Sequence, residues 1–144
     1  MSVVKGNRRE SKVEFDNNYF KIHDDAVRII KNSFGADKEE RKTNAAYIRA
    51  VSIKVLEDVL DIGKYIRMAN SIYPKTKVEF EERRINQDKA IGLCFDLLTK
   101  YQLVMNTLKV KDDKYTVEIK NISHEINCIK SWRASDNKRF KDLG

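Results

Sequence analysis

The sequence contains very little glycine and proline, with five Gly and one Pro among 144 residues. Loops and tight turns depend on these two residues, so their scarcity disfavours turn-rich folds and favours long helices. No apolar stretch approaches the roughly 18 residues that indicate a membrane span. The N-terminus also lacks the apolar segment of a secretory signal. These absences predict a soluble, cytoplasmic protein that is not a membrane partner.

Cysteine and histidine are equally scarce. Cys94 and Cys128 are far apart, and each falls within a helical apolar pattern, so we expect reduced core thiols rather than a disulfide or metal ligands. His23 and His124 are expected at a helix surface or cap. No Glu-x-x-His pair, phosphate-binding loop or nucleophile elbow is present. The sequence therefore predicts no enzyme activity, no cofactor and no metal site.

Apolar residues recur at alternating steps of three and four along four segments, and this spacing predicts four helices. The first begins at a capping box formed by Ser11 and Glu14 and stops near Gly35. The second begins somewhere between residues 37 and 44, where Asp37 offers a cap, and ends before Pro74.

The third predicted helix has the most regular pattern. Thr76 and Glu79 supply its capping box, and it extends to Leu108. The fourth opens at Asp112 or Asp113 and continues through a series of tyrosine and isoleucine: Tyr115, Ile119, Ile122, Ile126 and Ile129. No segment alternates with a period of two, so no strand is expected.

Short connections between these segments favour antiparallel neighbours. The predicted fold is therefore all-α, an antiparallel up-down-up-down four-helix bundle over residues 12–134, with a basic arm at 1–11 and a basic tail at 135–144. Four apolar positions fit equally well in the bundle core or at an interface between subunits: Val51, Leu60, Leu97 and Val104.

The positive charge is concentrated at the two ends of the chain. Residues 1–12 carry four cations against Glu10, a net charge of +3, and residues 130–144 carry five cations against Asp136 and Asp142, again +3, out of a formal +7. In an up-down-up-down bundle both ends lie beside the turn between the second and third helices. The sequence thus predicts one cationic end that suits a polyanion, although solvated termini would give the same composition.

Clustered lysine and arginine bind phosphates with little sequence preference, which points to nucleic acid. The residues predicted to form this site are Lys5, Arg8, Arg9, Lys12, Arg67, Lys75, Arg83, Arg84, Trp132, Arg133, Lys138, Arg139 and Lys141.

Two features of this region have alternative interpretations. Arg84 and Gln87 interrupt the apolar series of the third helix, either because that helix extends past the core or because polar groups there fix helix pairing. Trp132 either closes the end of the bundle or offers a platform on which a base could stack.

Several segments, in this order and spacing, resemble one bacterial four-helix-bundle family. They are the opening Ser2-Val3-Val4-Lys5 with Arg8, Arg9 and Ser11, then Ala69-Asn70-Ser71-Ile72-Tyr73-Pro74, then Glu82-Arg83-Arg84 through Gln87 to Ala90-Ile91, and Trp132-Arg133 with Ser135, Asp136 and Arg139. The family includes the accessory variability determinant of diversity-generating retroelements, and a related branch is encoded in intervening sequences of ribosomal RNA genes.

The resemblance implies a non-enzymatic subunit that assembles with copies of itself into a homopentameric barrel. It further implies that the subunit binds a reverse transcriptase and a structured RNA or an RNA/DNA hybrid. The expected function is that of an RNA-binding accessory protein of such an element. The alternative is an oligomeric protein-interaction scaffold, like the ribosomal intervening-sequence branch, without specific nucleic-acid binding.

Overall fold

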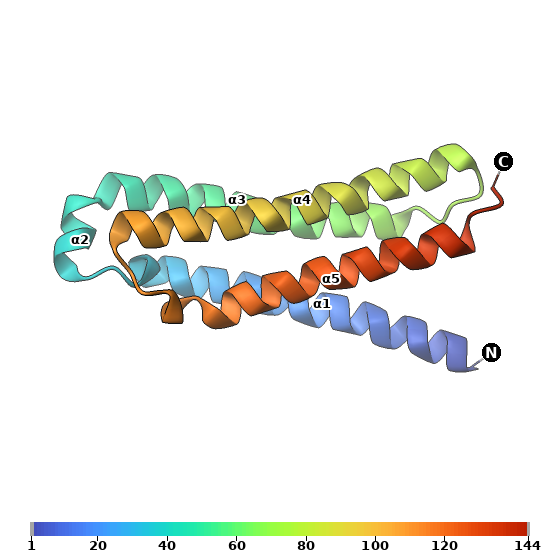
Figure 1. Ribbon diagram of the computed structural model, residues 1–144, viewed down its shortest axis with the longest axis horizontal. Coiled ribbons are helices and arrows are strands. Elements are labelled where there is room, and N and C mark those ends of the chain that lie inside the picture. The colour runs from blue at the N-terminus through green and yellow to red at the C-terminus, as the bar shows by residue number, and fades with distance from the viewer. Residues whose placement is uncertain (1, 144) are drawn as a thin grey trace.

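The computed structural model of the protein describes the backbone of residues 2–143 and the side chains of residues 17–143. Over this range the protein is helical without strands, and four long helices pack together (Figure 1). The long helices are α1 (Ser2–Lys31), α3 (Ala45–Ser71), α4 (Lys77–Leu108) and α5 (Thr116–Arg139), and the short ones are η1 (Ser33–Gly35), α2 (Lys38–Thr43) and η2 (Asp112–Lys114).

Helix α1 begins at Ser2, far earlier than expected. Ser11 and Glu14 therefore lie inside a continuous helix and do not form its N-terminal capping box, so the predicted start is wrong. The segment before Ser11 contains no proline and mostly residues that tolerate a helix, so nothing in it stops the helix from continuing. Figure 1 shows the N-terminal part of α1 diverging from the other long helices.

The predicted caps of the next two segments are confirmed. The Asp37 side chain accepts a hydrogen bond from the Glu40 backbone N–H at 2.8 Å, and this cap starts the short helix α2 before α3. Thr76 and Glu79 form a reciprocal capping box at the start of α4. These are local interactions within four residues, which is why the sequence pattern finds them.

The chain leaves α1 through a left-handed turn. Phe34 and Gly35 have φ values of 60° and 81°, and the Phe34 side chain is buried. The Tyr115 hydroxyl donates a hydrogen bond to the Phe34 carbonyl, which ties this turn to the start of α5. Gly35 thus stands where only glycine is free of backbone strain.

Contacts between α4 and α5 occur in opposite order along the two helices. Arg83 contacts Asp136, whereas Tyr101 contacts Glu118, so the two helices are antiparallel. The start of α1, the α3–α4 connection and the end of α5 lie at the same end of the molecule (Figure 1). This is the end at which the sequence concentrates its cations, and it is called the cationic end below.

The core lies between the four long helices and is mostly aliphatic. Leu97 and Val104 are buried in it, Val51 is partly buried, and Leu60 is largely exposed. Central members of the core are Ile22, Ala26, Val55, Val59, Ile62, Cys94, Tyr101, Ile122 and Ile129. The four positions left open by the sequence thus divide between core and surface.

The two cysteines have different surroundings. Cys94 is buried, and burial raises the pKa of its thiol well above its usual range, as expected of a core thiol. Cys128 is only partly buried, and its Sγ lies 3.5 Å from His124 Nε2 on the same helix. The expectation of a core position is therefore correct for Cys94 alone.

Helices α1 and α3 approach each other closely at Gly63. A Cβ at this position would lie 2.5 Å from Tyr19 Cζ, and the Tyr19 hydroxyl donates to the Val59 carbonyl at 2.8 Å. The tyrosine ring therefore occupies space that only glycine leaves open. Any larger residue must displace the ring and break its hydrogen bond.

We expect Gly63→Ala to lower the free energy of unfolding by about 1–3 kcal/mol, because overpacking outweighs the gain in helix propensity. Gly92→Ala is the matched control, since a Cβ there meets no atom within 4 Å. That substitution should instead stabilise the protein by about 1 kcal/mol. Urea denaturation of both variants measures the difference, and equal effects at the two positions would contradict the close approach.

Among the described residues, no helix combines the length and apolar character needed to cross a membrane.

Candidate nucleic-acid interface

The cationic end is built from the end of α3, the start of α4 and the end of α5. Six of the predicted site residues in this region have exposed side chains: Arg67, Lys75, Arg84, Lys138, Arg139 and Lys141. Their guanidinium and ammonium groups are accessible to an anionic ligand. This part of the predicted site is therefore brought together at one end of the fold.

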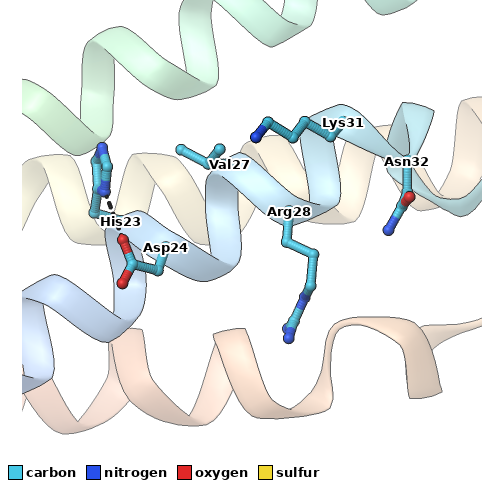
Figure 2. A pocket seen from close by; sticks show the side chains of 6 residues that line it. All are labelled: His23, Asp24, Val27, Arg28, Lys31 and Asn32. Carbon is cyan, nitrogen blue, oxygen red and sulfur yellow. Dashed lines mark hydrogen bonds and ion pairs between the residues drawn. The ribbon is translucent and has the colours of Figure 1, made fainter.

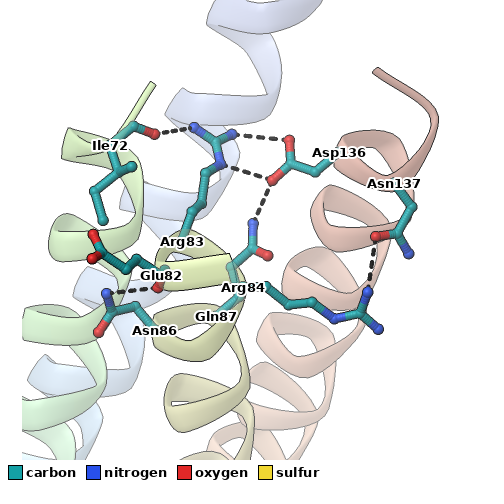
Figure 3. Close-up of polar contacts among 8 residues, drawn as sticks. All are labelled: Ile72, Glu82, Arg83, Arg84, Asn86, Gln87, Asp136 and Asn137. Atoms are coloured by element: carbon teal, nitrogen blue, oxygen red, sulfur yellow. Dashed lines mark hydrogen bonds and ion pairs between the residues drawn. The ribbon is translucent and has the colours of Figure 1, made fainter. Parts of the chain in front are cut away.

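Arg83 is the exception, because its side chain is buried and only 6% of the residue is exposed. Its Nε and Nη2 donate to the two carboxylate oxygens of Asp136 at 2.7 and 3.0 Å, and its Nη1 donates to the Ile72 carbonyl at 2.9 Å (Figure 3). The sequence predicts a phosphate contact for Arg83, whereas these three hydrogen bonds turn its guanidinium toward partners within the protein. Its guanidinium instead joins the α3–α4 connection to the end of α5.

The Asp136 carboxylate also accepts a hydrogen bond from Gln87 Nε2 at 2.8 Å (Figure 3). Gln87 is buried, whereas Arg84 is exposed and its Nη1 donates to Asn137 Oδ1 at 3.2 Å. The two polar residues that interrupt the apolar series of this helix thus differ: Gln87 fixes the pairing of α4 with α5, and Arg84 lies in water.

Aromatic side chains surround the Arg83 guanidinium. Its Cζ lies 4.9 Å from the centre of the Trp132 ring and 5.8 Å from that of Phe140. Phe140 in turn packs edge-on against Tyr73, with ring centres 5.7 Å apart. Trp132 is partly buried and packs against the core, so it closes the end of the bundle rather than forming an open stacking platform.

Helix α5 continues through the first half of the predicted basic tail, residues 135–144. It ends at Arg139, and both Asp136 and Phe140 are buried. The helix thus extends five residues beyond position 134, where the sequence predicts the bundle to end. The buried Arg83–Asp136 pair and the packed Phe140 ring hold this segment against the start of α4.

Arg133 also has a partner. It is partly buried, and its Nη1 forms an ion pair with the Asp88 carboxylate of α4. This pairing lowers its availability to an outside anion compared with Lys138 or Arg139.

Four predicted site residues belong to the N-terminal segment, where the structure does not describe side chains: Lys5, Arg8, Arg9 and Lys12. Their backbone belongs to α1.

Sequence reasoning overlooked Asp136 as the partner of Arg83, although a signal was present. Ile122 and Ile129 are spaced by seven residues on the inner face of α5, and the next step of seven reaches Asp136. A carboxylate at an inward helical position predicts a buried cationic partner, because an unpaired buried charge is very costly.

A shallow hollow lies on α1, in the half of the helix that leads away from the cationic end (Figure 2). Its lining comes entirely from one stretch of the chain: His23, Asp24, Val27, Arg28, Lys31 and Asn32. His23 Nδ1 lies 3.0 Å from Asp24 Oδ1 on the surface. Within the described part of the chain, no group of three or more His, Cys, Asp or Glu side chains is placed to hold a metal ion.

No family model, curated protein or solved structure matches the chain. The cationic end is defined by its own geometry: exposed lysine and arginine side chains around a buried Arg83–Asp136 ion pair.

Proposed function

We propose that the protein is a non-enzymatic, RNA-binding accessory subunit that partners a reverse transcriptase in a diversity-generating retroelement. The observation that carries the proposal is the convergence of exposed cations at one end of the fold, contributed by α3, α4 and α5. Phosphate oxygens are the natural ligands of such a surface, because lysine and arginine contact them with little dependence on sequence.

The rigid support beneath these cations favours a binding surface over a frayed tail. Asp136 and Phe140 anchor the last turn of α5, so Lys138 and Arg139 are held on an ordered helix. An ordered cation loses less conformational entropy on binding than one on a disordered tail. We also propose that the four long helices run in up-down-up-down order. The proposed ligand is a structured RNA or an RNA/DNA hybrid.

Neutralising four cations of this end tests the proposal. We expect Arg8→Gln/Arg9→Gln/Lys138→Gln/Arg139→Gln to bind a structured RNA more weakly. We also expect the slope of log affinity against log salt to fall by about 3, at about 0.7–0.9 per lost phosphate contact. Fluorescence anisotropy over a salt series measures both quantities.

The matched control removes four cations from the opposite end of the molecule: Lys38→Gln/Lys42→Gln/Lys111→Gln/Lys114→Gln. Both variants lose the same formal charge, so a general electrostatic effect would weaken RNA binding equally. A loss confined to the first variant supports the cationic end as the site. Unchanged binding by the first variant would refute the assignment.

Exposed apolar side chains on α3 and α4 favour assembly with a protein, which is also the basis of the alternative function as an interaction scaffold. Four such side chains are each at least half exposed: Ile53, Leu60, Ile85 and Leu103.

We also propose, on the basis of the family resemblance, that the protein assembles into a homopentamer. Light scattering of the purified protein tests the assembly, and co-purification with the reverse transcriptase tests the partner. An oligomer that retains no RNA at physiological salt would favour the scaffold.

A further inference from the structure

Helix α5 directs all of its acidic side chains inward. Glu118, Glu125 and Asp136 are exposed by only 1%, 0% and 1%, respectively. The cations of the same helix face outward instead. Arg133 is partly buried, and the other four are exposed: Lys120, Lys130, Lys138 and Arg139. Across Thr116–Arg139, all of which the structure describes, the outward surface of the helix carries positive charge without any exposed acid.

Each of the three acids is held in the interior by a specific contact. Asp136 is paired with Arg83, Glu125 Oε1 accepts from Asn18 Nδ2 at 3.0 Å, and Glu118 Oε2 accepts from the Tyr101 hydroxyl at 2.8 Å. Burial raises the pKa of Glu118 to about 8, so its carboxyl is mostly neutral at pH 7. Because Arg83 balances the charge of Asp136 and Glu118 is mostly neutral, these two acids offset little of the positive field outside the helix.

The outward face of α5 also carries small polar side chains between its lysines. Ser123, Asn127 and Ser131 are exposed and lie within one helical face that begins near Lys120 and ends near Lys138. At 1.5 Å per residue, the two lysines lie about 27 Å apart along the axis. Hydroxyl, amide and ammonium donors are the groups that contact phosphate and sugar oxygens in nucleic-acid complexes.

We propose that this outward face of α5 is a lengthwise binding track for the sugar–phosphate backbone of RNA, continuous with the cationic end. The inference rests on the proposed RNA-binding function and specifies where the ligand lies. RNA follows the side of the bundle from Lys138 to Lys120 instead of touching only its end.

The chemistry of the face favours RNA over other polyanions. A helix that binds an anionic membrane surface combines its lysines with large apolar side chains, and on this face of α5 Val117 is the one large apolar residue that is exposed. Beside the track, Phe95 of α4 is 49% exposed, and the Lys130 Nζ lies 5.5 Å from its ring centre. An aromatic ring next to a phosphate-binding lysine provides a surface on which a base stacks, which an acidic peptide would not use.

Two lysines of the track, Lys120 and Lys130, are not among the predicted site residues at the cationic end, so they test the track separately. We expect Lys120→Gln/Lys130→Gln to weaken binding of an RNA hairpin and to lower the salt slope by about 1.4–1.8. Lys42→Gln/Lys54→Gln on α2 and α3 removes the same charge and should leave the slope unchanged. Phe95→Ala should weaken binding to a single-stranded RNA without changing the salt slope, because stacking involves no counterion release.

The outcomes separate this inference from the proposed function. If the wild-type protein binds the hairpin and the track variant binds with the same affinity and slope, the track is refuted while the cationic end can still be the site. If the wild-type protein does not bind RNA at any salt, the proposed function fails and the track with it. If polyglutamate competes with the hairpin as well as unlabelled RNA does, the assignment of RNA as the occupant is overturned.

Discussion

Replacing Arg83 with methionine is expected to lower the free energy of unfolding by about 3–5 kcal/mol, the usual cost of leaving one member of a buried ion pair without its partner. The substitution strands the Asp136 carboxylate, which is 1% exposed, and leaves the Ile72 carbonyl without its donor. Chemical denaturation followed by circular dichroism measures the loss. We expect the end of α5 to be affected first, because the Arg83 contacts anchor it.

Two controls distinguish this effect from a general loss of charge. Arg84→Met alters the neighbouring residue, which is exposed and donates to Asn137, and should change the stability by less than about 0.5 kcal/mol. Arg83→Met/Asp136→Asn removes both charges while keeping an acceptor for Gln87, so it should recover a large part of the stability. If the single and double variants were equally unstable, the ion pair would not be the cause.

The second large effect is expected at Glu118, and it has the opposite sign. The pKa of this buried carboxyl is raised to about 8 from an ordinary value of 4.5, mainly by loss of hydration. A raised carboxyl pKa means that the folded state binds the proton more tightly than the unfolded state. The protein is then progressively destabilised as pH rises from about 4.5 to about 8.

Glu118→Gln removes this penalty, because an amide needs no proton to stay neutral. At pH 7 we expect the variant to be more stable than the wild type by on the order of 3 kcal/mol, whereas at pH 4.5 the two should be similar. Denaturation curves at several pH values measure the divergence. Glu39→Gln, an exposed carboxyl on α2, is the control and should leave the pH dependence unchanged. A Glu118→Gln variant less stable than the wild type at pH 8 would contradict the neutral, buried state.

The starts of helices were predictable where they depend on neighbouring residues. The Asp37 cap and the Thr76–Glu79 box each involve residues three positions apart, so the sequence contains the whole interaction. The same rule failed at Ser11 because a capping motif can also occur within a helix. Whether a helix continues past such a motif depends on the residues before it and on how the rest of the fold accommodates the longer helix.

The candidate site was predictable as a region but not residue by residue. The sequence located the cations of the second half of the chain at one end, where Lys75, Lys138 and Arg139 are exposed. It could not separate Arg83 from Arg84, which are adjacent in the chain. One is buried in an ion pair and the other is in solvent.

By itself the sequence determined the helical class of the protein, through its scarcity of proline and glycine and its apolar spacing, and the concentration of charge at both ends. Only the tertiary structure decided which charges reach the surface. Successive residues of a helix point about 100° apart, so one step along the chain separates a core position from an exposed one. The direction that becomes the core is set by the packing of α3, α4 and α5, and that packing turns Glu118 and Asp136 inward and leaves the lysines of α5 facing the solvent.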